Sequence, residues 1–215
     1  MGGAPRVLNI AFALGLAAGA LFGQAIEFES GGLKYQTLTR EGLTIMFAEL
    51  PIQVRGYAVL QVAVSNGSPS VRSVKPEDFR FTRGDGAAIP AAPARKVVGE
   101  FLDRGGRSDV IRLTSTYELG LYGLTRFSST NGYEARRREA LAEVSSTRLK
   151  AAAAASAIAF IPSKLAPGMS TDGAVFFPTQ GKPLGAGKLV VTPGAERFEF
   201  ELGGLSHPGA LKSRP

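Results

Sequence analysis

Alternating hydrophobic and polar residues predict short β-strands in two separate parts of the chain, residues 57–90 and 165–202. The run 57–65 has one wholly apolar face and one mixed face, which is typical of a half-buried antiparallel strand. Turn residues follow it at 66–69, and residues 79–81 form the next strand. Short strands separated by Gly and Pro turns favour a β-sandwich over alternating strands and helices.

The second part contains predicted strands at residues 173–178, 188–192 and 197–202. In the last of these, the apolar residues Phe198, Phe200 and Leu202 point inward, while the charged residues between them face water. We expect the two parts of the chain to share one core although they are far apart in sequence. Its predicted members are Leu60, Val62, Phe79, Val175, Phe176 or Phe177, Val190, Phe198 and Phe200.

Several turn and strand motifs follow one another in an order that resembles a known group of proteins. A Val-rich strand ends in Asn66-Gly67-Ser68, and the later motifs are Pro76-x-Asp78-Phe79, Asp85-Gly86, Leu165-x-Pro167-Gly168 and Gly173-x-Val175-Phe176-Phe177. This order is similar to that of bacterial extracellular immunoglobulin-like domains of unknown function, found in lipoproteins and some secreted actinobacterial antigens. The resemblance implies a mainly β fold, an immunoglobulin-like antiparallel β-sandwich, in an envelope setting. It offers no catalytic residues to carry over.

Residues 95–164 depart from that pattern and predict a helical insertion. A short helix over residues 97–102 stops near Gly105-Gly106, and a second helix is capped by Ser108. The spacing of apolar residues predicts one buried stripe on the second helix. This stripe consists of Val110, Ile111, Leu113, Thr114, Tyr117 and Leu121.

The best predicted helix runs from Glu134 to about Ile161 and stops at Pro162. Its first half carries Arg and Glu residues at pairing distances and should remain in water. Its second half, residues 151–161, is rich in Ala, whose small side chain permits close packing against a sheet or another helix. This half is too short to cross a bilayer, which requires about 20 apolar residues.

The N-terminal residues predict a secretory signal peptide. Arg6 is the sole charged residue before Glu27, residues 7–22 are almost entirely apolar, and small residues precede a cleavage site after Ala25. The alternative is a membrane anchor of marginal length. We expect residues 1–25 to be removed from an exported protein, periplasmic or extracellular. The sandwich with its insertion would then occupy residues 26–202, and residues 203–215 would form a flexible tail.

Composition narrows the chemistry further. The chain contains no cysteine, which excludes disulfides, thiol catalysis, cysteine-ligated metals and lipid attachment through cysteine. Its formal net charge of +7, reduced by one if Arg6 is removed, gives a weak attraction to anionic envelope surfaces. Nucleic acid is not an expected partner, because export removes it and no aromatic-basic binding motif accompanies the charge.

No residue pattern indicates an active site, a metal centre or a nucleotide loop. The single histidine, His207, lies in the expected tail. Asp78 and Asp85 lie at turns, where Asp commonly caps backbone groups. Asn66-Gly67-Ser68 matches a glycosylation acceptor by pattern, although a turn between strands already explains these residues. We therefore expect a non-catalytic protein without a cofactor.

The favoured interpretation is an envelope interaction module in which the sandwich is a scaffold and the helical insertion is the specialised surface. Its partner would be an envelope protein or another envelope component. The candidate interaction residues are Tyr117, Tyr122, Tyr133, Arg136, Arg137 and Arg138. Packing of the tyrosines on the sandwich, and a solvated face for the arginines, are the structural alternatives. The alternative function is peripheral membrane-surface binding through the basic helix at residues 134–150.

Overall fold

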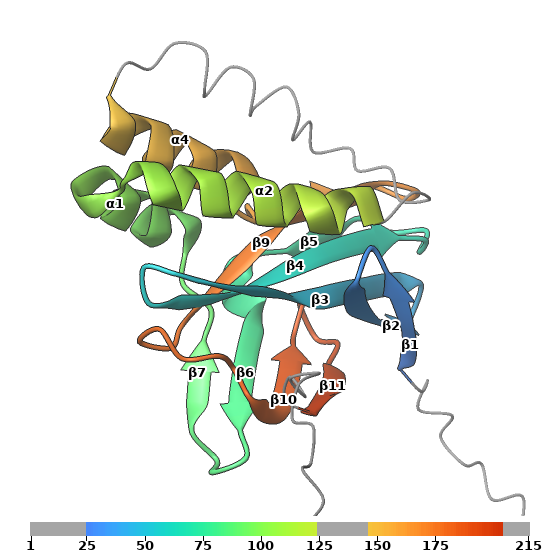
Figure 1. The fold of residues 1–215 in the computed structure, drawn as a ribbon. Coiled ribbons are helices and arrows are strands. Elements are labelled where there is room, and N and C mark those ends of the chain that lie inside the picture. The colour runs from blue at the N-terminus through green and yellow to red at the C-terminus, as the bar shows by residue number, and fades with distance from the viewer. Residues whose placement is uncertain (1–24, 124–145, 204–215) are drawn as a thin grey trace, which may run out of the picture.

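A computed structural model of the protein describes residues 25–123 and 146–203, which form two antiparallel sheets and a layer of helices (Figure 1). The first sheet has the order β1-β2-β3-β4-β9, with β1 (Ile26–Ser30), β2 (Leu33–Arg40), β3 (Leu43–Val54), β4 (Tyr57–Asn66) and β9 (Ser170–Pro178). The second has the order β11-β10-β6-β7, with β6 (Phe79–Arg83), β7 (Ala88–Pro90), β10 (Ala186–Val191) and β11 (Phe198–Gly203). The fold class is therefore mainly antiparallel β.

Short elements and helices complete the described chain. A two-stranded ribbon pairs β5 (Arg72–Val74) with β8 (Ser163–Leu165), and a 3-10 turn (Pro76–Asp78) precedes β6. The helices are α1 (Ala94–Arg104), α2 (Arg107–Gly123) and α4 (Thr147–Ile158). They lie between β7 and β8 in sequence, so the helical insertion is confirmed in the described residues.

The two sheets face each other across a common core. The predicted core residues Leu60, Val62, Phe79, Val175, Phe177, Phe198 and Phe200 all belong to it. Aromatic rings join the two sheets, since the ring centroids of Phe47 and Phe200 lie 5.0 Å apart in an edge-to-face arrangement. Of the two alternatives at 176–177, Phe177 is the member of this core. Val190 is buried but lies outside it, because Leu189 and Val191 are the inward residues of β10.

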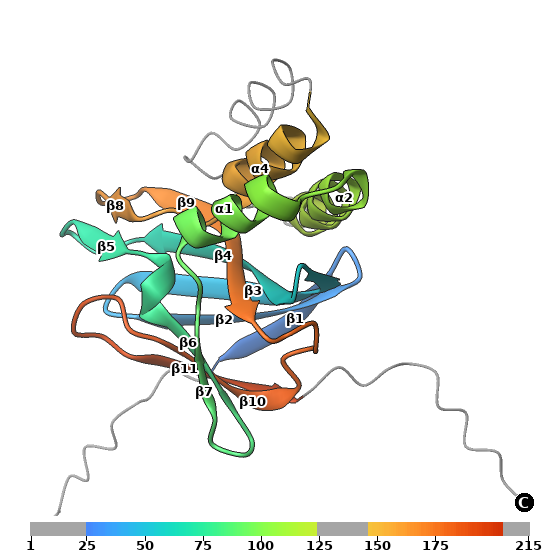
Figure 2. The same ribbon diagram turned by 90° about the vertical axis from the view of Figure 1, so that its left-hand side faces the viewer.

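A second core lies between the helices and the opposite face of the first sheet (Figure 2). Apolar residues of that face, including Tyr57, Val59 and Phe176, pack against Phe101, Leu113 and the alanines of α4. The prediction of a half-buried strand at 57–65 is therefore wrong. β4 is the fourth strand of five, and the helices cover its mixed face. All eight residues from Tyr57 to Val64 are therefore buried, and Gln61 is the polar one among them.

The Ala-rich helix is confirmed in its second half and shorter than predicted. Ala151, Ala154 and Ala155 are fully buried in the second core. Ser146 has extended backbone angles (φ −80°, ψ 136°), so no continuous helix runs from Glu134 to Ile161. At the other end α4 stops at Ile158, because the amide of Phe160 donates to the carbonyl of Ala174 in β9. Residues 134–145 lie outside the described chain.

The helix over residues 97–102 is confirmed within α1, whereas the start of α2 differs from the prediction. α2 begins at Arg107, and the carboxylate of Asp109 accepts the amide of Gly106 at 2.8 Å, so Ser108 is not the cap. Leu113 and Tyr117 form the buried stripe, but Ile111 is 56% exposed. The side chain of Leu121 is outside the described set.

The chain ends are described only in part. Gly203 is the last residue of β11 and so does not belong to a tail. Residues 1–24 and 204–215, which include the expected signal peptide and His207, lie outside the described residues. Ala25 is partly buried against the core between the sheets. None of the described helices combines the length and apolar character that a membrane span requires.

Candidate functional site

Two of the motifs identified in the sequence, Asn66-Gly67-Ser68 and Leu165-x-Pro167-Gly168, meet at one end of the first sheet. The side-chain amide of Asn66 donates to the carbonyls of Ser70 and Leu165, each at 2.8 Å, and its oxygen accepts the amide and hydroxyl of Ser68. The backbone amide of Gly168 donates to the carbonyl of Asn66 at 2.6 Å. Residues 66–68 and 165–168 are therefore tied together through one buried side chain.

These hydrogen bonds give Asn66 and Ser68, the two residues of the glycosylation pattern, a structural role. The side chain is 0% exposed, and both hydrogens of its nitrogen are used in hydrogen bonds. A glycan attached to that nitrogen would have to occupy the same buried space. In the folded chain Asn66 thus has a structural role, in agreement with the turn interpretation.

Asp78 and Asp85 also have local backbone roles. The Asp78 carboxylate accepts the amide of Lys75 at 2.9 Å, and the Asp85 carboxylate accepts the amide of Ala87 at 2.9 Å. Burial raises the pKa of Asp78 above its ordinary value, and the hydrogen bond from Lys75 opposes this shift. Throughout residues 25–123 and 146–203, no group of three or more His, Cys, Asp or Glu residues could hold a metal ion.

Tyr117 is not a surface residue. It is 1% exposed, and its hydroxyl donates to the carboxylate of Asp172, which is also 1% exposed. It lies one helical turn after Leu113, on the stripe of α2 that faces the first sheet. The prediction that Tyr117 belongs to an exposed interaction surface is therefore wrong. Its ring packs and its hydroxyl ties α2 to β9, as the packing alternative anticipated.

A second buried polar pair lies on the same face of the sheet. The hydroxyl of Tyr35 in β2 donates to the side-chain oxygen of Gln61 in β4 at 3.3 Å. Burial raises the pKa of Tyr35 to about 12, so this hydroxyl stays protonated and remains a donor at neutral pH. Both pairs join elements of the fold and neither is open to a partner.

The other proposed interaction residues are Tyr122, Tyr133, Arg136, Arg137 and Arg138. Tyr122 belongs to α2, but its side chain is outside the described set. Tyr133, Arg136, Arg137 and Arg138 lie outside the described residues. These five residues remain sequence predictions.

The described helices nevertheless present a charged surface of their own. They carry seven Lys or Arg residues, all exposed, and four Asp or Glu residues, of which Asp103 is the exposed one. Asp109 is buried and accepts two hydrogen bonds from Arg55, at 2.6 and 2.8 Å. Half-buried Glu100 accepts the hydroxyl of Tyr57 at 2.8 Å. The described acids are thus mostly turned inward, while the cations face water.

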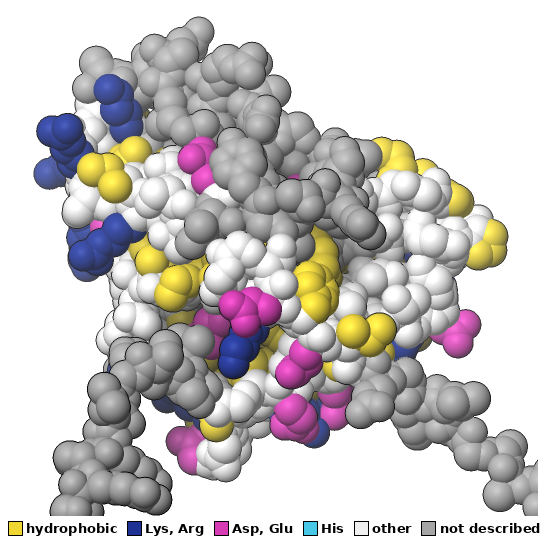
Figure 3. Space-filling view, turned by 45° about the vertical axis from the view of Figure 1, so that its right-hand side comes forward, with side chains coloured by type: hydrophobic (Ala, Val, Ile, Leu, Met, Phe, Trp, Pro, Cys, Tyr) yellow, Lys and Arg dark blue, Asp and Glu magenta, His cyan; other side chains and the backbone are white. Residues whose placement is uncertain are grey.

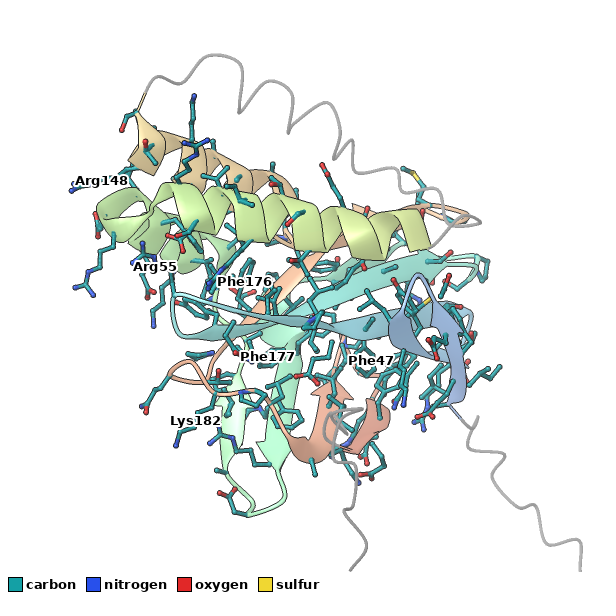
Figure 4. The ribbon with its side chains drawn as sticks, in the orientation of Figure 1. Phe47, Arg55, Arg148, Phe176, Phe177 and Lys182 are labelled. Atoms are coloured by element: carbon teal, nitrogen blue, oxygen red, sulfur yellow. The ribbon has the colours of Figure 1, made fainter. Side chains whose placement is uncertain are left out.

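Four of these cations lie where the ends of three helices meet. Arg104 ends α1, Arg107 begins α2, and Arg148 and Lys150 lie in the first turn of α4. Exposed apolar side chains accompany them, with Leu102 45%, Leu149 46% and Ile111 56% exposed. We call this surface the basic corner, defined by Leu102, Arg104, Arg107, Ile111, Arg148, Leu149 and Lys150. Figure 3 shows Lys and Arg side chains beside hydrophobic ones at this end of the helical layer, and Figure 4 labels Arg148 there.

A close approach at Gly105 brings the corner together. A β-carbon at Gly105 would lie 2.5 Å from the β-carbon of Ala151 and 2.3 Å from the carbonyl oxygen of Phe101. Only glycine therefore lets the link between α1 and α2 rest directly on α4. This contact joins Arg104 and Arg107 to Arg148 across more than forty residues of sequence.

Gly105→Ala is expected to lower the free energy of unfolding by about 1 to 3 kcal/mol, because the added methyl group overlaps backbone and a packed side chain. Denaturant unfolding measures the difference. Gly99→Ala in α1 is the matched control, since nothing lies within 4 Å of its added β-carbon. There alanine should be neutral or stabilising by up to about 1 kcal/mol. Equal stability of both variants would contradict the close contact.

Sequence reasoning missed the basic corner, although one signal for it was available. The predicted boundary at Gly105-Gly106 already put Arg104 and Arg107 on either side of a helix junction. The sequence did not reveal that the start of α4 packs against this junction. That contact depends on Ala151 and Gly105, neither of which carries a functional group.

Comparisons with known proteins add no family. No family model matches the chain, and no curated protein matches it. Among solved structures, the crystal structure of the yjhA protein from Bacillus subtilis aligns with a TM-score of 0.30 and 10% sequence identity. The alignment covers 78% of each chain. A likeness at this level carries no argument about fold or function.

Proposed function

We propose that this protein is a non-catalytic interaction module of the cell envelope. In this proposal the two sheets form an immunoglobulin-like β-sandwich that acts as a rigid scaffold, and the outward side of the helical layer is the binding surface. Support for the sandwich comes from two antiparallel sheets that share one core. Further support comes from the joining of the Asn66 and Leu165 motifs in one hydrogen-bonded end.

The observation that carries the proposal is a difference in ion pairing between the two sides of the molecule. On the outer face of the second sheet, Lys188 pairs with Glu199 and Glu201, each at 3.1 Å, and Arg197 pairs with Glu199. At the basic corner no described acid forms an ion pair with any of the four cations. Exposed cations that form no ion pair with an acid in the described residues, next to exposed leucines, suit binding to an external anionic component.

The envelope setting rests on the sequence of residues 1–25, with its single Arg6 and the apolar run that follows. An exported protein meets few nucleic acids and many anionic envelope surfaces. A rigid β scaffold that presents a specialised surface on an inserted element is a common arrangement for binding. No cofactor or catalytic residue is part of the proposal.

Site-specific crosslinking tests the proposal. Because the chain contains no cysteine, an introduced cysteine provides a single reactive thiol. Ile111→Cys puts one thiol at the basic corner, and Lys182→Cys puts one in the loop between β9 and β10, across the first sheet from the helices (Figure 4). After a thiol-directed photo-crosslinker is activated in intact envelopes, we expect adducts from position 111 and few from 182. N-terminal sequencing of the same preparation should begin at about Ile26. Equal adducts from both positions would refute the helical layer as the binding surface.

A further inference from the structure

We infer that the basic corner docks on the surface of an anionic phospholipid bilayer. This inference rests on the proposed function, because it names the partner of the same helical surface. The corner differs from the predicted basic helix at residues 134–150, since four of its seven residues come from α1 and α2 before that segment begins and two of them, Leu102 and Ile111, are apolar. Arg148, Leu149 and Lys150 are shared between the two.

Charge is the first argument. Arg104, Arg107, Arg148 and Lys150 are exposed and belong to one convergence of helix ends, and the exposed acid nearby in sequence is Asp103. The N-termini of α2 and α4 also lie here and add partial positive charge, which outweighs the partial negative charge at the C-terminus of α1. Clustered Lys and Arg residues are attracted to the negative surface potential of anionic lipids.

The apolar side chains decide between a bilayer and a purely ionic partner. Leu102, Ile111 and Leu149 are each about half exposed at the corner. Ile111 lies one helical turn after Arg107, on the same side of α2. A polyanionic polysaccharide would engage the cations and leave these side chains in water. A bilayer interface takes both, with aliphatic groups entering the acyl boundary while long cationic side chains reach the headgroups.

The corner is also held rigidly enough to act as one surface. Phe101 and Ala151 are fully buried beneath it, and Gly105 packs directly against Ala151. Its cations therefore keep their relative positions without help from a partner, which lowers the ordering entropy lost on docking.

Tryptophan reporters test insertion directly, because the chain contains no tryptophan. Leu149→Trp reports on the basic corner. Val71→Trp reports on the loop before β5, where the side chain of Val71 is 62% exposed. The exported protein is mixed with vesicles of equal parts phosphatidylglycerol and phosphatidylcholine, or of phosphatidylcholine alone. We expect a blue shift and quenching by bromine-labelled acyl chains for Leu149→Trp with the anionic vesicles. Val71→Trp should not respond.

Salt and charge reversal supply the second part of the test. Raising the salt to 1 M shortens the Debye length to about 3 Å and should abolish the response. Arg104→Glu combined with Arg148→Glu should weaken vesicle binding by about thirtyfold or more. The control combines Arg80→Glu with Lys182→Glu, two exposed residues away from the helices, and changes the net charge equally. It should weaken binding by less than about threefold.

The outcomes separate the two proposals. Equal weakening by the two double variants would overturn the inference, because binding would then follow net charge rather than the basic corner. Absence of a vesicle response, with crosslinks still formed from Ile111→Cys, would overturn the lipid partner and leave the interaction module standing. Absence of both would overturn the lipid inference and the proposed function together.

Discussion

Replacement of Ala155 by Asp is expected to remove most of the stability of the fold. Ala155 is 0% exposed and lies in the apolar core between α4 and the first sheet. A carboxylate there loses its water without gaining a partner, which costs several kcal/mol. A typical domain is stable by about 5 to 15 kcal/mol in total. Urea denaturation followed by circular dichroism measures the loss.

Ser156→Asp is the matched control for this variant. Ser156 is the neighbouring residue in α4 and is exposed, so the same carboxylate remains in water. Ser and Asp have similar helix propensities, and the change should stay within about 1 kcal/mol. Arg148→Ala, at an exposed position in the first turn, should alter stability by less than about 0.5 kcal/mol. An Ala155→Asp protein that unfolds like its parent would mean that α4 does not bury this face.

Phe200→Ala should be a costly truncation in the other core, at about 3 to 5 kcal/mol. Phe200 is 1% exposed, and its ring meets that of Phe47 across the two sheets with centroids 5.0 Å apart. Removing it leaves a cavity and also takes away the edge-to-face contact. Thermal and denaturant unfolding report the change.

Phe28→Ala provides the comparison for Phe200→Ala. Phe28 is 38% exposed on the edge strand β1, where its ring stacks on Tyr35 at a centroid distance of 5.3 Å. Its removal should cost clearly less than that of Phe200, because part of the ring is already in water. If Phe200→Ala changed stability by less than about 0.5 kcal/mol, the placement of β11 against the first sheet would be incorrect.

Strands with one apolar face were predictable from the sequence. Residues 198–202 alternate as expected, with Phe198, Phe200 and Leu202 buried and Glu201 exposed. β6 was found for the same reason, and α1 was found from its run of apolar residues and its glycine stop. β9 and β10 were located by their apolar runs and flanking turns, but β9 is buried on both faces, and the inward residues of β10 are Leu189 and Val191 instead of the expected Val190.

The first three strands were not predicted, and a weak local pattern explains this only in part, because β2 alternates normally with Leu33 and Tyr35 buried on either side of exposed Lys34. All five residues of β1 are at least partly exposed, so its pattern lacks a buried face. β3 contains Pro51, and its register with β4 shifts between Glu49 and Gln53, which interrupts the alternation. β4 was found but taken as half-buried. Its second buried face exists only because helices distant in sequence cover it, and no local pattern encodes that cover.

The charged and apolar character of the proposed binding surface was predictable from the sequence, but its position was not. The sequence indicated that the helical insertion carries basic and apolar residues. It did not distinguish a tyrosine that packs from one that faces a partner, and Tyr117 proved to be of the first sort. The corner itself arises from residues 102–111 and 148–150, which meet through contacts between Gly105 and Ala151.

The position of Ala25 determines how the protein would be oriented if it were attached to a surface through the residues before Ala25. Ala25 packs against the core between the sheets, whereas α1, α2 and α4 cover the opposite face of the first sheet (Figure 1). A chain immobilised through its N-terminus would turn the basic corner away from the support. If the apolar segment remained embedded in a membrane, the same geometry would direct the corner outward, and the protein would bridge two surfaces instead of lying flat on one.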